Sequence, residues 1–196
     1  MLTQIFNSIN WVDVVLFLLF AKVVFFSVKS GFVAEGFRFL GSFIAVVYVL
    51  HQYSFIADWL ANRTKLDLGF LSWLVFILLW LCVVLAFFGL HRLVVMLFKI
   101  EANHQMVDKY AAGFLGAARG MFVVSLAIFG LLLFNQTWLS KQTVNSLAYK
   151  LTAKVAPNTY RLAYEGLLAK LFEGQKFNDN VFAVIDHHGI NPKRHH

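Results

Sequence analysis

The stretch of residues 69–90 constrains the fold most strongly, because its twenty-two residues include no charged side chain. About 20 consecutive apolar residues allow a helix to cross the ~30 Å hydrocarbon core of a bilayer. The rest of the chain has the same character, since 60% of its 196 residues are hydrophobic, 14% are charged and the mean hydropathy is +0.69. A soluble globular domain of this length is far less apolar. The sequence therefore predicts a polytopic membrane protein.

Three further segments are apolar enough to join this one in a bundle. They are residues 14–28, residues 32–50, and residues 121–134 together with the segment that leads into them. Lys29 and Gly31 belong to a tight turn between the first two. We expect the polar interval of residues 51–68 to form a short helix on the membrane surface. The predicted fold is all-α, with about four transmembrane helices and an amphipathic C-terminal tail.

Residues 108–120, DKYAAGFLGAARG, open the last predicted span and contain several small residues at helical spacing. Gly116 and Gly120 form a GxxxG pair, and Gly113 extends the pattern toward the N-terminus. Such spacing lets a neighbouring helix approach backbone to backbone in lipid. We therefore expect a close helix contact here, within one chain or between two chains. Gly130 is a control for this contact if its face of the helix meets lipid.

Charged residues within the predicted spans form a second pattern. Asp108 and Arg119 are eleven residues apart, about three turns, so both project from one face of a helix. An arginine at lipid depth costs roughly 2.5–3.5 kcal/mol on insertion scales and is usually retained for a partner. Glu35 can pair with Arg38 on its own helix, or reach across to Arg119 or Lys22. These charges either tie helices together or line a polar route.

The composition changes after residue 134, so we divide the chain into a membrane bundle (1–134) and an amphipathic basic tail (135–196). One-sided apolar stripes predict two tail helices, from about Ser140 to Pro157 and from Asn158 to Gly174. Their basic faces suit anionic lipid headgroups or a partner protein, and packing against the protein's own surface is the alternative. Residues 176–196 are expected to be loosely ordered.

Searches for catalytic and ligand-binding motifs lead to a negative prediction. HExxH, GxSxG, P-loop and GxGxxG patterns are absent, so we expect no enzyme activity and no cofactor. The C-terminal histidines lack the spacing of metal ligands. Cys82, the single cysteine, is expected to be a buried small hydrophobe. The net charge of +7 is spread around apolar runs, which favours lipid headgroups over nucleic acid as the anionic partner.

The charged and glycine positions together resemble those of the colicin V production protein (CvpA) family over residues 13–134. The residues that carry the resemblance are Asp13, Lys29, Gly31, Phe32, Glu35, Asp108, Gly113, Gly116, Arg119 and Gly120. The resemblance implies a multi-pass protein of the bacterial inner membrane, associated with colicin V production or export and with envelope homeostasis. It implies no known molecular activity.

Two function classes follow. The first is a non-enzymatic membrane factor that assists toxin export or maintains the envelope, with an export or envelope protein as partner. The second is a small channel or transporter built by homo-oligomers, in which the buried charges line a polar path. Four spans place both termini on one side, and the basic residues near the short loops favour the periplasm for the termini.

Overall fold

The computed structural model describes residues 10–98, 106–134, 137–171 and 176–189, and every regular element within these ranges is helical. Four long helices come first: α2 (Trp11–Ser30), α3 (Phe32–Ala61), α4 (Leu68–Phe98) and α5 (Met106–Leu133). The tail contains α6 (Thr137–Asn145), α7 (Leu147–Thr152), α8 (Val155–Ala163), the π-helical turn η1 (Tyr164–Leu168), α9 (Ala169–Leu171) and α10 (Asn180–Gly189). The all-α prediction is confirmed.

Each of the four long helices contains a span long and apolar enough to cross a membrane, as the sequence predicted. The first of these helices, α2, begins directly after Asn10. The backbone N–H of Asn10 donates a hydrogen bond to Asp13 Oδ2 at 3.0 Å. α3 has 30 residues and is therefore about 45 Å long at ~1.5 Å per residue. That length exceeds the ~30 Å hydrocarbon core, so α3 must tilt or extend beyond it.

The expected surface helix within residues 51–68 was wrong. α3 continues without a break to Ala61, although this part of the chain contains several polar residues. Val49, Tyr53 and Ala57 recur every four residues and are all buried, so one face of the helix stays in the core beyond the predicted end of the span. The polar side chains occupy the other faces.

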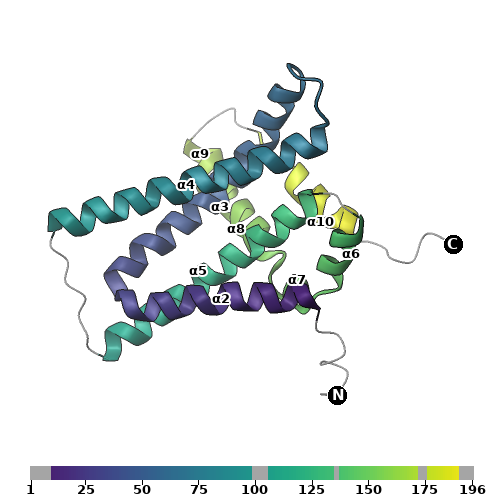
Figure 1. Cartoon of the computed structure of the whole chain (residues 1–196). Helices are drawn as coiled ribbons and strands as arrows, with labels where there is room; N and C mark the ends of the chain where they lie inside the picture. Colours follow the sequence, from purple (N-terminus) through teal and green to yellow (C-terminus); the bar gives the residue numbers. More distant parts are fainter. Residues whose placement is uncertain (1–9, 99–105, 135–136, 172–175, 190–196) are drawn as a thin grey trace.

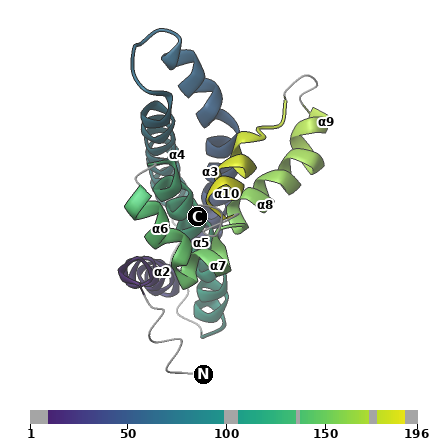
Figure 2. The same ribbon diagram turned by 90° about the vertical axis from the view of Figure 1, so that its right-hand side faces the viewer.

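α5 lies at the centre of the bundle (Figures 1 and 2). It packs along α2 on one side and along α3 on another, while α4 packs mainly against α3. α2 and α3 are consecutive, yet they contact each other little because they diverge after their shared turn.

The largest core cluster lies where α3, α4 and α5 meet the tail. Tyr53, Phe76 and Phe129 form a mutual aromatic contact with ring centroids 5.4–6.1 Å apart, and all three are at most 2% exposed. Away from this cluster, α4 is largely exposed and presents large apolar side chains such as Leu81 and Leu85. Cys82 is also exposed on α4, so the prediction that it is buried was wrong.

The tail packs against the bundle at the end where the N-terminal part of α2 lies (Figure 1). Tyr160 of α8 is completely buried, and its hydroxyl lies 2.9 Å from His51 Nδ1 of α3. The side-chain amide of Asn178 donates to the Leu50 carbonyl at 2.6 Å, and the backbone N–H of Ala156 donates to Ser125 Oγ at 2.9 Å. The tail's apolar faces therefore pack on the protein's own helices.

The predicted boundaries in the tail were partly wrong. Pro157 does not end a helix but lies in the first turn of α8, where a missing N–H removes no helical hydrogen bond. Ser140 and Asn158 lie inside helices rather than at their caps. The expectation of loose order fails for α10, whose Val181 and Ile185 are buried. Gly174 and residues 190–196 lie outside the described residues.

Candidate functional site

The turn between α2 and α3 is built from Gly31 and capped by Asp108 of α5. Gly31 has φ 81°, a left-handed conformation that L side chains rarely adopt, and it separates Ser30 from Phe32. Asp108 Oδ1 accepts a hydrogen bond from the Phe32 backbone N–H at 3.0 Å. The carboxylate thus satisfies one of the free donors at the N-terminus of α3, where the helix dipole also favours a negative charge.

The glycines of α5 allow α2 to approach closely. A Cβ atom at Gly116 would lie 2.2 Å from Cβ of Ser27, and one at Gly120 would lie 2.7 Å from the ring of Phe20. At Gly113 the nearest atom would be in Val28, at 3.2 Å. The expected close contact is therefore present, and it joins two helices of one chain.

Gly130 was a wrong choice of lipid-facing control. It is buried, and a Cβ atom there would lie 3.1 Å from the ring of Phe76 on α4. Gly36 of α3 is a better control, because a Cβ atom there would meet nothing within 4 Å.

Glu35, one turn into α3, is the centre of an ion-pair cluster. Its side chain is completely buried, and Oε1 lies 3.0 Å from Nε of Arg119. Oε2 lies 3.5 Å from Nη1 of Arg38, which also donates to Ser30 Oγ. Arg119 Nη2 donates to Ser27 Oγ at 3.4 Å. Both pairings considered for Glu35 with arginines are observed, and the carboxylate bridges α3 to α5.

Two guanidinium groups share the carboxylate of Glu35 in this cluster. Arg119 is only 13% exposed and Arg38 is 30% exposed. Burying ions is costly unless each has a partner at good geometry, and removal of one partner is then strongly destabilising. The cluster therefore depends on Glu35 being ionised and in place.

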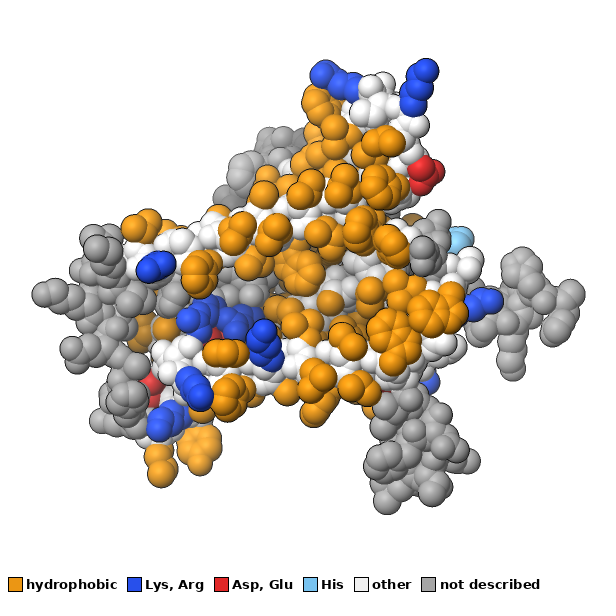
Figure 3. Space-filling model, viewed as in Figure 1, with side chains coloured by type: hydrophobic (Ala, Val, Ile, Leu, Met, Phe, Trp, Pro, Cys, Tyr) orange, Lys and Arg blue, Asp and Glu red, His pale blue; other side chains and the backbone are white. Residues whose placement is uncertain are grey.

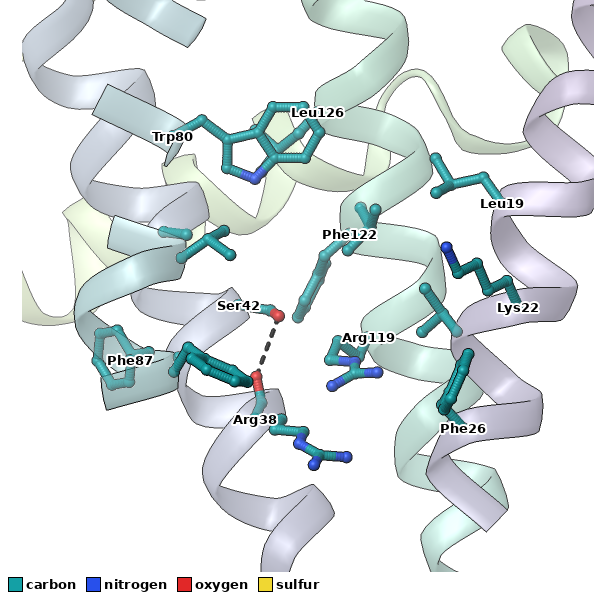
Figure 4. Close-up of a pocket in the computed structure, with 16 residues that line it drawn as sticks. Leu19, Lys22, Phe26, Arg38, Ser42, Trp80, Phe87, Arg119, Phe122 and Leu126 are labelled. Atoms are coloured by element: carbon teal, nitrogen blue, oxygen red, sulfur yellow. Dashed lines mark hydrogen bonds between the residues drawn. The ribbon is translucent and has the colours of Figure 1, made fainter. Parts of the chain in front are cut away.

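A cavity of about 480 Å³ opens above the cluster (Figure 4). Four long helices line it: Leu19, Lys22, Val23 and Phe26 from α2; Arg38, Gly41, Ser42 and Ala45 from α3; Trp80, Val84, Phe87 and Phe88 from α4; and Arg119, Phe122, Val123 and Leu126 from α5. In Figure 4, Lys22 extends from α2 toward the cavity, while Arg38 and Arg119 approach it from α3 and α5. The walls are mostly apolar, and the polar groups are mainly basic.

Asp13 and Lys29, the remaining predicted positions, lie outside the ion-pair cluster. Asp13 is buried near the opposite end of α2, and its Oδ1 accepts from the backbone N–H of Ala148 at 2.8 Å. It therefore stabilises the N-termini of both α2 and the tail helix α7. Lys29 is exposed, with Nζ 4.1 Å from the ring centroid of Phe25.

Sequence reasoning missed Ser27, Ser30 and Phe20, which complete the site from α2. Ser27 is completely buried, and a polar residue within an apolar span is a signal for a helix contact in lipid. Phe20 carried no such signal, because an apolar side chain in a span can face lipid or protein equally well.

A comparison with models of known protein families gives one match that covers the site residues. The family model described as "Colicin V production protein" matches residues 12–157. The match includes all ten positions that carry the resemblance, and it continues through α6 and α7 into α8. A search of curated proteins and a search of solved structures gave no match. Because the family model covers well over half of the chain, this protein belongs to the colicin V production protein family.

Proposed function

We propose that the protein is a non-enzymatic factor of the bacterial inner membrane that acts in the production or export of a colicin V-type toxin, or in envelope homeostasis. The observation that carries the proposal is the Glu35–Arg119 pair at the base of a basic cavity. Family membership supports the biological setting. The cavity supports a role that depends on holding or passing another molecule in the membrane.

The use of the acidic motif residues supports a non-enzymatic role. Asp13 and Asp108 accept hydrogen bonds from helix N-termini, and Glu35 neutralises Arg119. A general acid or base must exchange its proton with a reacting group within hydrogen-bond reach. These carboxylates are instead committed to structural contacts.

A channel formed by several chains is the alternative. The sequence basis for it is the set of buried charges that can line a polar path, and the GxxxG pair is a device that can join helices of different chains. Gly116 and Gly120 face Ser27 and Phe20 of the same chain, so this surface is already occupied. The cavity cations still favour an anion path if chains associate through another face.

Complementation tests the proposal. In a toxin-producing bacterium that lacks its own family member, the full chain is expected to restore secreted toxin activity or resistance to detergent stress. Arg119→Ala is expected to lose that rescue, whereas Lys29→Ala, which removes an exposed cation, is expected to keep it. Failure of the unaltered chain to restore either phenotype, despite normal membrane levels, would overturn the proposal. Anion flux through proteoliposomes that depends on Arg119 would favour the channel.

A further inference from the structure

The cavity between α2 and α4 has a charge imbalance. Its sixteen lining residues include the cations Lys22, Arg38 and Arg119 and no acidic side chain. Glu35, which does not line the cavity, forms ion pairs with Arg119 and Arg38. Lys22 takes part in neither of these ion pairs, so a positive charge remains beside a mostly apolar space, and an anionic occupant would neutralise it.

Lys22 makes the imbalance most acute because of its depth. It lies eight residues before the end of α2 at Ser30, about 12 Å along the axis, which is close to the middle of a ~30 Å hydrocarbon core. The ion pairs that Glu35 forms with Arg38 and Arg119 do not include Lys22. A cation at this depth is normally retained because it meets an anion or lines a wet path.

The cavity is accessible from the side of the bundle. Figure 3 shows basic side chains at the surface in the hollow between α2 and α4. The residues that border this hollow are large and apolar, with Phe26 51% exposed on α2 and Phe88 62% exposed on α4. A surface of this kind contacts acyl chains, so a molecule that enters here comes from the bilayer.

We propose that this cavity binds the phosphate headgroup of an anionic phospholipid, which enters sideways between α2 and α4. Guanidinium groups suit phosphate oxygens because their planar N–H donors match them in pairs, and Lys22 adds a third positive charge. Arg119 lines the cavity while its Nε lies 3.0 Å from Glu35 Oε1 and its Nη2 donates to Ser27 Oγ, so the guanidinium is held at the cavity wall. The acyl chains lie against Phe26 and Phe88. A volume of about 480 Å³ is within the range of small-molecule sites.

This site differs from a general attraction of the basic tail to a charged membrane. Surface attraction depends on the number of basic residues near the headgroups and falls with salt. Binding in the cavity depends on Lys22 in particular, is limited to one or a few lipids, and is lost when the apolar space is filled. These differences define the test.

The test measures lipid binding to the purified full chain by native mass spectrometry from detergent micelles. Phosphatidylglycerol is expected to bind more tightly than phosphatidylcholine. Lys22→Gln is expected to weaken phosphatidylglycerol binding by about fivefold, the contribution of one basic residue to headgroup attraction. Lys29→Gln is the matched control, because it removes the same charge from the same helix outside the cavity lining, and binding should be unchanged.

A second variant separates charge from space. Val84→Trp on α4 places a larger side chain in the cavity without altering any charge, and it is expected to reduce phosphatidylglycerol binding as well. Thermal unfolding of each variant in phosphatidylcholine shows whether it is folded, and added phosphatidylglycerol should raise the melting temperature of the unaltered chain more than that of Lys22→Gln. Equal binding of the two lipids, or equal effects of Lys22→Gln and Lys29→Gln, would overturn the proposal. Displacement of the lipid by inorganic phosphate at equal concentration would also overturn it, in favour of a free anion.

Discussion

Breaking the Glu35–Arg119 pair gives the most direct test of how α5 is held to α3. Arg119→Met removes the guanidinium but keeps a long apolar side chain, so the carboxylate of Glu35 stays completely buried with Arg38 as its remaining ionic partner. Loss of one partner from a buried pair costs about 3–5 kcal/mol. We expect a value near 3 kcal/mol here, because Arg38 at 3.5 Å retains part of the compensation.

Glu35→Leu is expected to be worse than Arg119→Met. It leaves the guanidinium of Arg119, which is only 13% exposed, without the carboxylate of Glu35. Arg38 is 30% exposed and can turn outward, so most of the penalty falls on Arg119. We expect a loss of about 4–5 kcal/mol, at the upper end of the range for a broken buried pair.

The double variant Glu35→Leu/Arg119→Met removes the buried charges together and places two apolar side chains in contact. Replacing a whole buried pair by apolar residues is often close to neutral. The loss should therefore be well below the sum of the two single losses, with a coupling energy of at least about 3 kcal/mol. The free energy of unfolding is measured in mixed micelles by tryptophan fluorescence, with Lys29→Met as an exposed control expected to lie within about 0.5 kcal/mol of the unaltered chain. Strictly additive losses would refute the direct pairing.

Two further predictions concern packing and the tail. Gly116→Ala should lower the free energy of unfolding by about 1–3 kcal/mol, because the added Cβ would lie 2.2 Å from Ser27 Cβ. Gly36→Ala is the control and should be neutral or stabilising. Equal effects of the two substitutions would refute the close contact. Tyr160→Phe should cost about 1–3 kcal/mol through its lost hydrogen bonds to His51 Nδ1 and the Asn178 N–H. Burial raises the pKa of Tyr160 to about 12 from 10.0, so the stability linked to its neutral phenol is complete below pH 10 and is lost between about pH 10 and 12. The difference between the unaltered chain and Tyr160→Phe should shrink across that interval, and a constant difference would contradict the burial of a neutral phenol.

The spans and the turn were predictable because each depends on local sequence. An uncharged run of sufficient length must form a helix in lipid, since every backbone polar group needs an internal partner. Gly31 marks the turn because its φ of 81° is costly for other residues. The pairing of Glu35 with Arg119 was also accessible, because an arginine inside a span requires a partner and few acidic residues were available.

The tail and the cavity were less predictable because they depend on which surfaces meet. An amphipathic stripe shows that one face is buried but does not identify what covers it. Tyr160 could have faced headgroups, yet it lies against α3 with its hydroxyl beside His51. Among the α10 residues whose burial the structure describes, Val181 and Ile185 are the buried pair, and two positions are too few for a periodic pattern in the sequence. The cavity depends on how far α2 and α3 diverge after their turn, and no local sequence pattern predicts this divergence.

The motif on α5 acts as one unit around the α2–α3 turn. Asp108 caps the first turn of α3, Gly116 admits Ser27 of α2, and Arg119 reaches Glu35 on the opposite side of the turn. Packing and electrostatics are coupled here, because the approach of α2 at Gly116 brings Ser27 Oγ to 3.4 Å from Arg119 Nη2. A side chain at position 116 would separate the helices and withdraw that hydroxyl from the guanidinium. The glycine is therefore required for the charge cluster as well as for the helix contact, and a variant at Gly116 should weaken the coupling between Glu35 and Arg119.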